Sequence, residues 1–255
     1  MVDELETARA WVAQARRVTV LTGAGVSTAS GIPDFRGPDG LWTKDPSAAA
    51  MFDIDRYRTD PELRVRAWQN RRHHPAWDAE PNVVHLALVR LESAGRLRSL
   101  LTQNIDGLHQ RAGSSPARVV ELHGTLYWAV CLSCGQRTTM AQVLARVDAG
   151  EPDPRCLRCG GLQRSATIAF GQSLDPQVLR DAVHAARDCD VFVAAGSSLQ
   201  VYPAAGLGQI AQDAGARLVV ANGSPTPYDE TADAVLRGEL TETVPALVDA
   251  AATSA

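Results

Sequence analysis

A short run of apolar and β-branched residues, 17–22, leads directly into the glycine-rich sequence Gly23-Ala24-Gly25. A buried strand followed by such a turn is how a nucleotide-binding βαβ unit begins, because the glycines keep the turn tight and let the backbone approach a pyrophosphate. Free N–H groups at the start of the next helix would add to a phosphate site. The pattern is weak alone, so its meaning depends on the rest of the chain.

Strand-like and helix-like segments alternate along the chain. Short apolar runs predict further strands at 97–102, 119–122, 191–195 and 218–221. Helical spacing of apolar residues predicts helices at 3–16, 83–93, 176–187 and 202–214. Continuous apolar strands between helices predict an α/β fold, with a Rossmann-type, mostly parallel sheet covered on both faces.

Two segments interrupt this alternation and predict a smaller domain. Residues 38–78 form a polar insertion with helical character, and residues 129–164 contain four of the five cysteines. We assign both to a small domain made of a helical insertion and a zinc module. The larger, dinucleotide-binding domain then comprises residues 1–37, 79–128 and 165–255.

The four paired cysteines are Cys131, Cys134, Cys156 and Cys159, in two C-x-x-C pairs. Two such pairs supply four thiolates for one tetrahedral Zn²⁺, and four protein ligands leave no open position, so the predicted site is structural. Two redox-active dithiols are the alternative, but that motif needs a different βαβ setting. The fifth cysteine, Cys189, is interpreted as a packing residue.

The net charge of −4 gives no general attraction to nucleic acid or to an anionic membrane. No apolar run approaches the roughly 18 residues of a spanning helix. The first 17 residues are partly acidic and lack the apolar stretch of a secretory signal. We therefore expect a cytoplasmic protein without nucleic-acid or membrane partners.

The glycine-rich turn departs from the fingerprint of hydride-transferring dehydrogenases. Thr28 occupies the third glycine position, and no acidic residue ends a second strand about 20 residues later. The chain continues instead into a loop, 30–37, that carries Phe35 and Arg36. The sequence predicts a dinucleotide site that serves other chemistry.

The stretch GAGVSTASGIPDFRG, residues 23–37, resembles the signature of the sirtuins, the NAD-dependent protein deacylases. Three further blocks agree in the same order, namely TQNIDGLH at 102–109, ELHG at 121–124 and GSSLQV at 196–201. The cysteine pairs lie between the last two blocks. The resemblance extends from about residue 17 to residue 245.

The resemblance implies a reaction in which NAD is consumed as co-substrate. The acyl-lysine oxygen attacks C1′ of the nicotinamide ribose, nicotinamide leaves, and a ribose hydroxyl deprotonated by a histidine attacks the resulting amidate. Lysine and O-acyl-ADP-ribose are released. His123 matches this base, and an imidazole suits proton abstraction near neutral pH. Asn104 is the second residue to which the resemblance gives a catalytic role.

The resemblance also implies which residues contact NAD. They are Gly23, Ala24, Gly25, Ser27, Phe35, Arg36, Gln103, Asn104, Ile105, Asp106, Gly196, Ser197, Ser198, Asn222 and Leu240. Other interpretations stay open for two groups. Asn and Asp are ordinary choices in a capped turn, and Arg36 could be a solvated charge.

The expected partner is an acyl-lysine protein or peptide, bound as a strand between residues 169–172 and 199–202. Phe170, Gly171 and Val201 resemble the family's substrate contacts, and binding through main-chain hydrogen bonds tolerates many peptide sequences. Gln172 replaces a glutamate often found there, which would weaken a preference for basic residues beside the target lysine. We expect a monomer.

Some relatives that prefer succinyl- or malonyl-lysine carry Tyr-x-x-Arg where this chain has Trp68-Gln69-Asn70-Arg71. Positions i and i+3 share a helix face, so Trp68 and Arg71 could both line an acyl pocket, with Arg71 pairing with a distal carboxylate. Equally, Arg71 and Arg72 could form a solvated helix face. Our hypothesis is deacetylation, with desuccinylation as a second activity.

Three competing functions remain. A protein ADP-ribosyltransferase would use the same cofactor cleavage, but His123 and Asn104 favour deacylation. A zinc-ribbon binding module would present a basic, aromatic surface, whereas this chain is acidic overall. A dehydrogenase conflicts with the altered glycine fingerprint.

Overall fold

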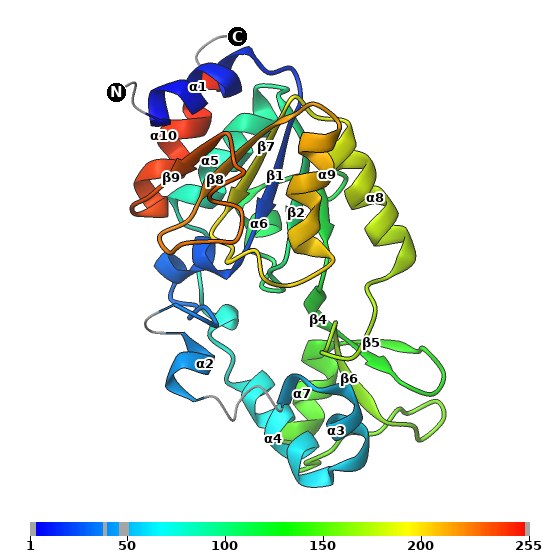
Figure 1. Ribbon diagram of the computed structural model, residues 1–255. Helices are drawn as coiled ribbons and strands as arrows, with labels where there is room; N and C mark the ends of the chain where they lie inside the picture. Colours follow the sequence, from blue (N-terminus) through cyan, green and yellow to red (C-terminus); the bar gives the residue numbers. More distant parts are fainter. Residues whose placement is uncertain (1–3, 38–39, 46–50, 253–255) are drawn as a thin grey trace.

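The computed structural model describes residues 4–37, 40–45 and 51–252; residues 38, 39 and 46–50, in the predicted small domain, lie outside the described residues. A six-stranded sheet forms the centre of the larger part of the molecule (Figure 1). Its strands, in spatial order, are β3 (Val119–Glu121), β2 (Leu97–Thr102), β1 (Val18–Thr22), β7 (Val191–Ala195), β8 (Arg217–Ala221) and β9 (Ala234–Leu236). All neighbouring pairs are parallel, which confirms the predicted fold class.

Helices cover both faces of this sheet. One face packs against α1 (Glu4–Gln14), α5 (Val83–Ser93) and α10 (Leu240–Ala252), and the other packs against α8 (Pro176–Arg187) and α9 (Leu207–Asp213). Successive side chains on a strand point to opposite faces, so Val20 joins the first core and Leu21 the second. Both faces of the sheet are therefore apolar, and helices pack on both of them, as predicted.

The smaller part of the molecule combines short helices with a three-stranded antiparallel sheet (Figure 1). Its elements are α3 (Ile54–Thr59), α4 (Pro61–Arg72), β4 (Gly124–Cys131), β5 (Arg137–Thr139), α7 (Met140–Asp148) and β6 (Gln163–Thr167). Trp68 of α4 is 1% exposed and packs with Met140 and Val143 of α7. The helical insertion and the cysteine-containing segment therefore share one core.

The predicted domain boundaries do not coincide with breaks in the backbone structure. The boundary between residues 128 and 129 falls within β4, and that between 164 and 165 falls within β6. Both strands are hydrogen-bonded through these positions. The exact boundaries stay a prediction.

Some local elements differ from the sequence expectations. The glycine-rich turn continues into a 3₁₀ segment, Ala24–Ser30, instead of an α-helix, and the N–H of Gly25 bonds to the neighbouring loop at Gly196. The predicted helix 202–214 is divided into a 3₁₀ turn, Ala204–Gly206, and α9. The remaining short elements are α2 (Leu41–Lys44), the 3₁₀ turn Pro75–Trp77 and α6 (Leu108–Ala112). Among the described helices, none combines the length and apolar character needed to cross a membrane.

Candidate functional site

The sheet order places a crevice at the ends of the central strands. After β1 the chain crosses to β2 on one side, whereas after β7 it crosses to β8 on the other, so the connections that follow β1 and β7 lead to opposite halves of the sheet. Open α/β sheets bind their ligands at this kind of switch point, outside the carboxyl ends of the strands. Most of the predicted cofactor residues lie there, since the loops that start at Gly23, Gln103, Gly196 and Asn222 follow β1, β2, β7 and β8, whereas Leu240 begins α10 after β9.

Glycines let the loops after β1 and β7 pack backbone against backbone. The N–H of Gly23 donates to Ala195 O at 3.0 Å, and that of Gly25 donates to Gly196 O at 2.9 Å. A Cβ atom on Gly23 would lie 2.6 Å from Gly196 O. Gly196 itself has a φ of +64°, which favours glycine, and its Cβ would lie 2.6 Å from Val26 N. Loop packing therefore requires these glycines independently of any phosphate.

A buried polar cluster joins the loops after β1 and β2. Ser27 Oγ donates to Asp106 Oδ2 at 2.8 Å, and Asn104 Nδ2 donates to Gly23 O at 3.0 Å and to Ser27 Oγ at 3.1 Å. Burial raises the pKa of Asp106, although the bonds from Leu108 N–H and Ser27 oppose this effect. Asn104 Oδ1 has no hydrogen-bond donor among the described residues, so this acceptor is left for a ligand.

His123 lies in the turn between β3 and β4 and is held by the loop after β2. Its Nδ1 is 3.1 Å from Gln103 O, and a carbonyl oxygen only accepts, so Nδ1 carries the proton. The lone pair of the neutral ring then lies on Nε2. Burial lowers the pKa of His123, which favours this neutral form near pH 7. Gln103 Nε2 also donates to Ser197 Oγ at 2.8 Å, and this bond connects the loop after β7 to the loop that holds His123.

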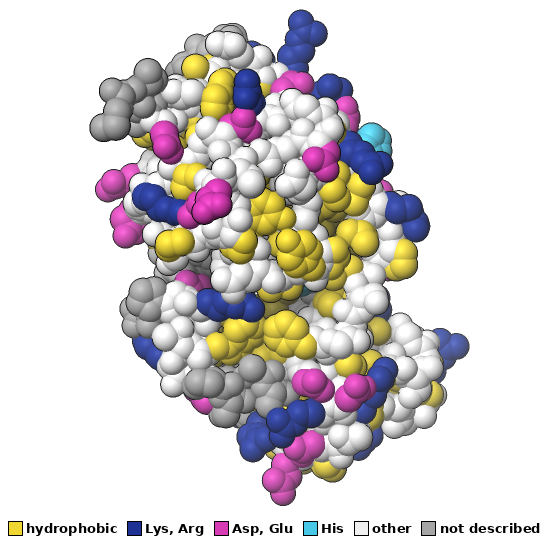
Figure 2. Space-filling model, in the orientation of Figure 1, with side chains coloured by type: hydrophobic (Ala, Val, Ile, Leu, Met, Phe, Trp, Pro, Cys, Tyr) yellow, Lys and Arg dark blue, Asp and Glu magenta, His cyan; other side chains and the backbone are white. Residues whose placement is uncertain are grey.

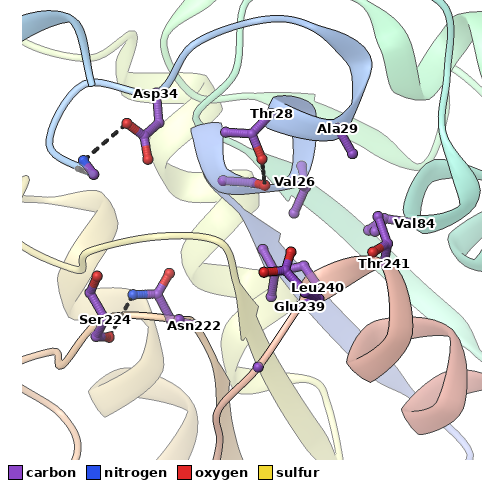
Figure 3. Close-up of a pocket in the computed structure, with 14 residues that line it drawn as sticks. Val26, Thr28, Ala29, Asp34, Val84, Asn222, Ser224, Glu239, Leu240 and Thr241 are labelled. Carbon is purple, nitrogen blue, oxygen red and sulfur yellow. Dashed lines mark hydrogen bonds between the residues drawn. The ribbon is translucent and has the colours of Figure 1, made fainter. Parts of the chain in front are cut away.

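A cavity of about 190 Å³ opens beside the first glycine loop and includes the predicted Asn222 and Leu240 (Figure 3). Asn222 Nδ2 donates to Ser224 O at 2.8 Å. Several other lining residues were not predicted from the sequence, namely Thr28, Asp34, Ser224, Glu239 and Thr241. Glu239 and Thr241 follow β9, whose three residues are too short a run to show a strand in the sequence.

The end of the loop 30–37, which carries Phe35 and Arg36, packs against a group of aromatic rings. The rings of Phe35 and Trp42 have centroids 4.8 Å apart, and Trp42 also contacts Phe170 at 5.6 Å. Arg36 Cζ lies 4.5 Å from the centroid of the Trp42 ring, and burial lowers the pKa of Arg36. Arg36 as a whole remains exposed, but its guanidinium is partly covered by the Trp42 ring. The other predicted cofactor residues, Ala24, Ile105 and Ser198, are half-buried in the loops after β1, β2 and β7.

The expected substrate segment is a turn with one open residue. Phe170 N donates to Phe52 O at 2.7 Å and Phe170 O accepts from Ile54 N, so its main-chain groups are already paired. Gly171 is exposed, and its N–H and C=O bond to no described residue. The Phe170 side chain is 44% exposed. Hydrophobic side chains gather across the middle of the face in Figure 2, at the level where the two parts of the molecule meet in Figure 1.

Val201 is half-buried in the loop after β7, and its C=O accepts from Ala205 N at 2.9 Å. Its N–H bonds to no described residue. This loop and the turn at Gly171 therefore each offer main-chain groups to an added strand.

Trp68 and Arg71 have different surroundings. Trp68 belongs to the core of the smaller part of the molecule, and its Nε1 has no partner among the described residues. Arg71 is half-buried without a carboxylate partner in the described part of the chain. Burial, and then the charge of Arg164, lowers the pKa of Arg71 to about 10, while Tyr57 opposes the shift.

The four paired cysteines come together as a candidate metal centre. Their Sγ atoms all lie within 4.8 Å of one another, and the Cys131–Cys159 and Cys134–Cys156 pairs are at 3.5 and 3.7 Å. A tetrahedral Zn²⁺ with bonds of about 2.3 Å needs sulfurs roughly 3.8 Å apart. Gly161 packs so closely that a Cβ would lie 3.0 Å from Cys131 Sγ. The four thiols therefore fit one zinc ion.

Comparisons with known proteins identify relatives over nearly the whole chain. The model of the Sir2 family matches residues 23–203. NAD-dependent protein deacetylase 2 of Streptomyces coelicolor is 54% identical over 231 residues, which cover 91% of this chain and 96% of that protein. NAD-dependent protein deacylase 2 of Archaeoglobus fulgidus is 39% identical over 98% of this chain and 96% of its own length.

Solved structures agree. A Sir2 structure with a deacetylated peptide and 3′-O-acetyl ADP-ribose has a TM-score of 0.88 and 34% identity, covering 97% of this chain and 98% of that one. A Sir2 protein bound to a propionylated peptide has a TM-score of 0.85 and 33% identity, with the same coverage.

Proposed function

The chain belongs to the Sir2 family of NAD-dependent protein deacylases, and we propose that it removes acyl groups from lysine side chains with His123 as the general base. NAD, when bound, supplies the electrophilic ribose carbon and the hydroxyl that receives the acyl group. The observation that carries the role of His123 is its bond to Gln103 O. This bond fixes the proton on Nδ1 and leaves Nε2 as the proton acceptor.

The Ser27–Asn104–Asp106 cluster supports binding and orientation of the nicotinamide ribose. Its members are held by one another, so they need little reorganisation when a ligand binds. Asn104 Oδ1 is the acceptor that remains for a ribose hydroxyl. The acyl-lysine peptide would lie as a strand between Gly171 and Val201, whose free main-chain groups give affinity without a strict sequence preference.

The role of His123 is tested by separating two parts of the reaction. The base acts after nicotinamide has left, so His123→Ala should lower deacetylation by about 100-fold or more while nicotinamide exchange into NAD is lowered much less. His184→Ala, at an exposed position on α8, is the matched control. Deacetylation near the parent rate in folded His123→Ala protein would contradict the proposal.

Arg71 supports a second acyl preference. Arg71 and Arg164 are cationic neighbours, Arg71 has no carboxylate partner among the described residues, and Tyr57 lies close enough to affect its pKa. A distal carboxylate of a succinyl group would compensate this charge. Trp68 lies on the same helix, α4, and is buried in the core against α7. It would therefore support the acyl site by fixing the position of this helix. We therefore include desuccinylation in the proposed function.

The comparison of acetyl- and succinyl-lysine versions of one peptide tests this part. Arg71→Met should lower kcat/KM for the succinyl peptide by about ten-fold or more and change the acetyl value little, since one charge-assisted pair is lost. Arg72→Met is the control, because Arg72 is exposed and pairs with Asp148. Equal losses on both peptides, or no succinyl turnover in the parent protein, would remove Arg71 from the acyl site.

We also propose that Cys131, Cys134, Cys156 and Cys159 hold one structural Zn²⁺. The thiol spacing supports this assignment, and four sulfur ligands leave no position for substrate. The ion would fix the turns before β5 and β6 and thereby the sheet on which the smaller part of the molecule is built.

A further inference from the structure

Two buried histidines lie behind the site and have no part in the chemistry described so far. His85 on α5 is 0% exposed and His109 on α6 is 1% exposed, and their ring centroids are 4.8 Å apart. Burial lowers the pKa of His85 to about 4, and burial together with His85 lowers that of His109 to about 3. Both rings are neutral at pH 7, so each has one donor and one acceptor nitrogen.

The hydrogen-bond partners determine which nitrogen carries the proton. The main-chain N–H of Asn82 donates to His85 Nδ1 at 3.2 Å, so the proton of His85 is on Nε2. His109 Nε2 lies 2.9 Å from Thr22 Oγ1, and that hydroxyl gives its own proton to Thr102 Oγ1 at 2.9 Å. Thr22 Oγ1 therefore accepts from His109, and the proton of His109 is also on Nε2.

The two remaining ring nitrogens are complementary. His85 Nε2 is a donor and His109 Nδ1 is an acceptor, and neither has a partner among the described residues. Buried polar groups are nearly always hydrogen-bonded, so a donor and an acceptor on adjacent rings indicate one connected unit. The observed bonds therefore form two segments, one from Asn82 to His85 and one from His109 through Thr22 to Thr102, and the unpartnered donor and acceptor lie on the two adjacent rings.

The segment of bonds that begins at His109 ends at the cofactor loops. Thr22 and Thr102 are the last residues of β1 and β2, immediately before the loops that start at Gly23 and Gln103. Thr102 Oγ1 also accepts from the main-chain N–H of Asn104 at 3.0 Å. The hydroxyl pair thus fixes the start of both loops.

We propose that His85 and His109 are positioning residues, which hold the Thr22–Thr102 hydroxyl pair and through it the backbone of Asn104 in the conformation that binds NAD. The inference rests on the proposed NAD site. The ring protonation state can be measured without NAD, so it can be tested separately from the function.

The first experiment is ¹⁵N NMR of the zinc-loaded protein with labelled histidine. The two-bond couplings should show both rings as neutral Nε2–H tautomers from pH 8 to pH 5. An Nδ1–H tautomer at His109, or an imidazolium at either position at pH 6, would overturn the proposal. This experiment needs no variant and is therefore independent of whether a substituted protein folds.

The second experiment compares His109→Leu with His109→Gln. Leucine removes the donor to Thr22, whereas the glutamine amide can donate from nearly the same place. In folded, active-site-titrated protein, we expect the KM for NAD to rise about ten-fold with leucine and to return most of the way with glutamine, with the peptide KM unchanged. A purely structural role would change the folded fraction only, so an unchanged KM for NAD in His109→Leu would refute the inference.

Discussion

Acidification should destabilise the protein through His85 and His109. In an unfolded chain each histidine has a pKa of about 6.5, whereas in the folded protein burial lowers the values to about 4 and about 3. The folded pKa values lie below the unfolded ones. At any pH between the folded and the unfolded pKa, the unfolded chain therefore binds more protons than the folded protein. The stabilisation is therefore complete above about pH 6.5 and is lost as the pH falls toward the folded values.

The magnitude follows from the same values. Between pH 7 and pH 5 the unfolded histidine goes from about one-quarter to nearly full protonation, while the folded rings stay neutral. Integration gives about 2 kcal/mol for each histidine and about 4 kcal/mol for the pair. Typical domains have a free energy of unfolding of roughly 5–15 kcal/mol, so this loss is a large share.

Urea unfolding followed by tryptophan fluorescence at pH 7 and pH 5 measures this loss. His109→Gln should lose about 2 kcal/mol less than the parent protein, because the substituted residue cannot bind a proton. His184→Gln, on the exposed side of α8, is the control. Protonation of zinc ligands also destabilises the protein at pH 5, but it does so in all three proteins and cancels in the comparison. An equal loss in parent and His109→Gln protein would refute the reasoning.

Two further predictions concern the loops and the metal centre. Gly23→Ala should lower the free energy of unfolding by about 1–3 kcal/mol, because its Cβ would lie 2.6 Å from Gly196 O. Gly223→Ala, whose Cβ meets nothing within 4 Å, is the control, and equal urea midpoints would contradict the packing role. Purified, reduced protein should contain one zinc per chain by elemental analysis. Cys156→Ser should lose that zinc and Cys189→Ala should retain it, so stoichiometric zinc in Cys156→Ser would exclude the four-cysteine site.

Continuous apolar segments were predictable from the sequence. The strands at Leu97–Thr102 and Val191–Ala195 and the helices at Val83–Ser93 and Pro176–Arg187 have the predicted bounds. The two strands are short runs rich in apolar residues, the two helices show helical spacing of apolar residues, and both helices begin after a residue whose side chain caps the first turn. Local sequence therefore suffices where an element buries a face of its own.

Shorter elements depend on their neighbours and could not be predicted in this way. β9 has three residues and is a strand because β8 pairs with it. The 3₁₀ segment after Gly23 is determined by the loop at Gly196, which is 173 residues away in the chain. The predicted cofactor residues came from the family resemblance, and the lining residues beyond those motifs, such as Glu239, were missed.

Two Leu-His pairs show why the chemistry of a site also depends on its three-dimensional surroundings. Leu108-His109 and Leu122-His123 are the same dipeptide. His123 bonds through Nδ1 to a carbonyl oxygen, so its Nε2 is free to accept a proton. His109 bonds through Nε2 to a hydroxyl that has already given its proton away, so its proton stays on Nε2. The same side chain is thus suited to a base at residue 123 and to a fixed donor at residue 109. The partner atom, which only the fold supplies, decides between the two.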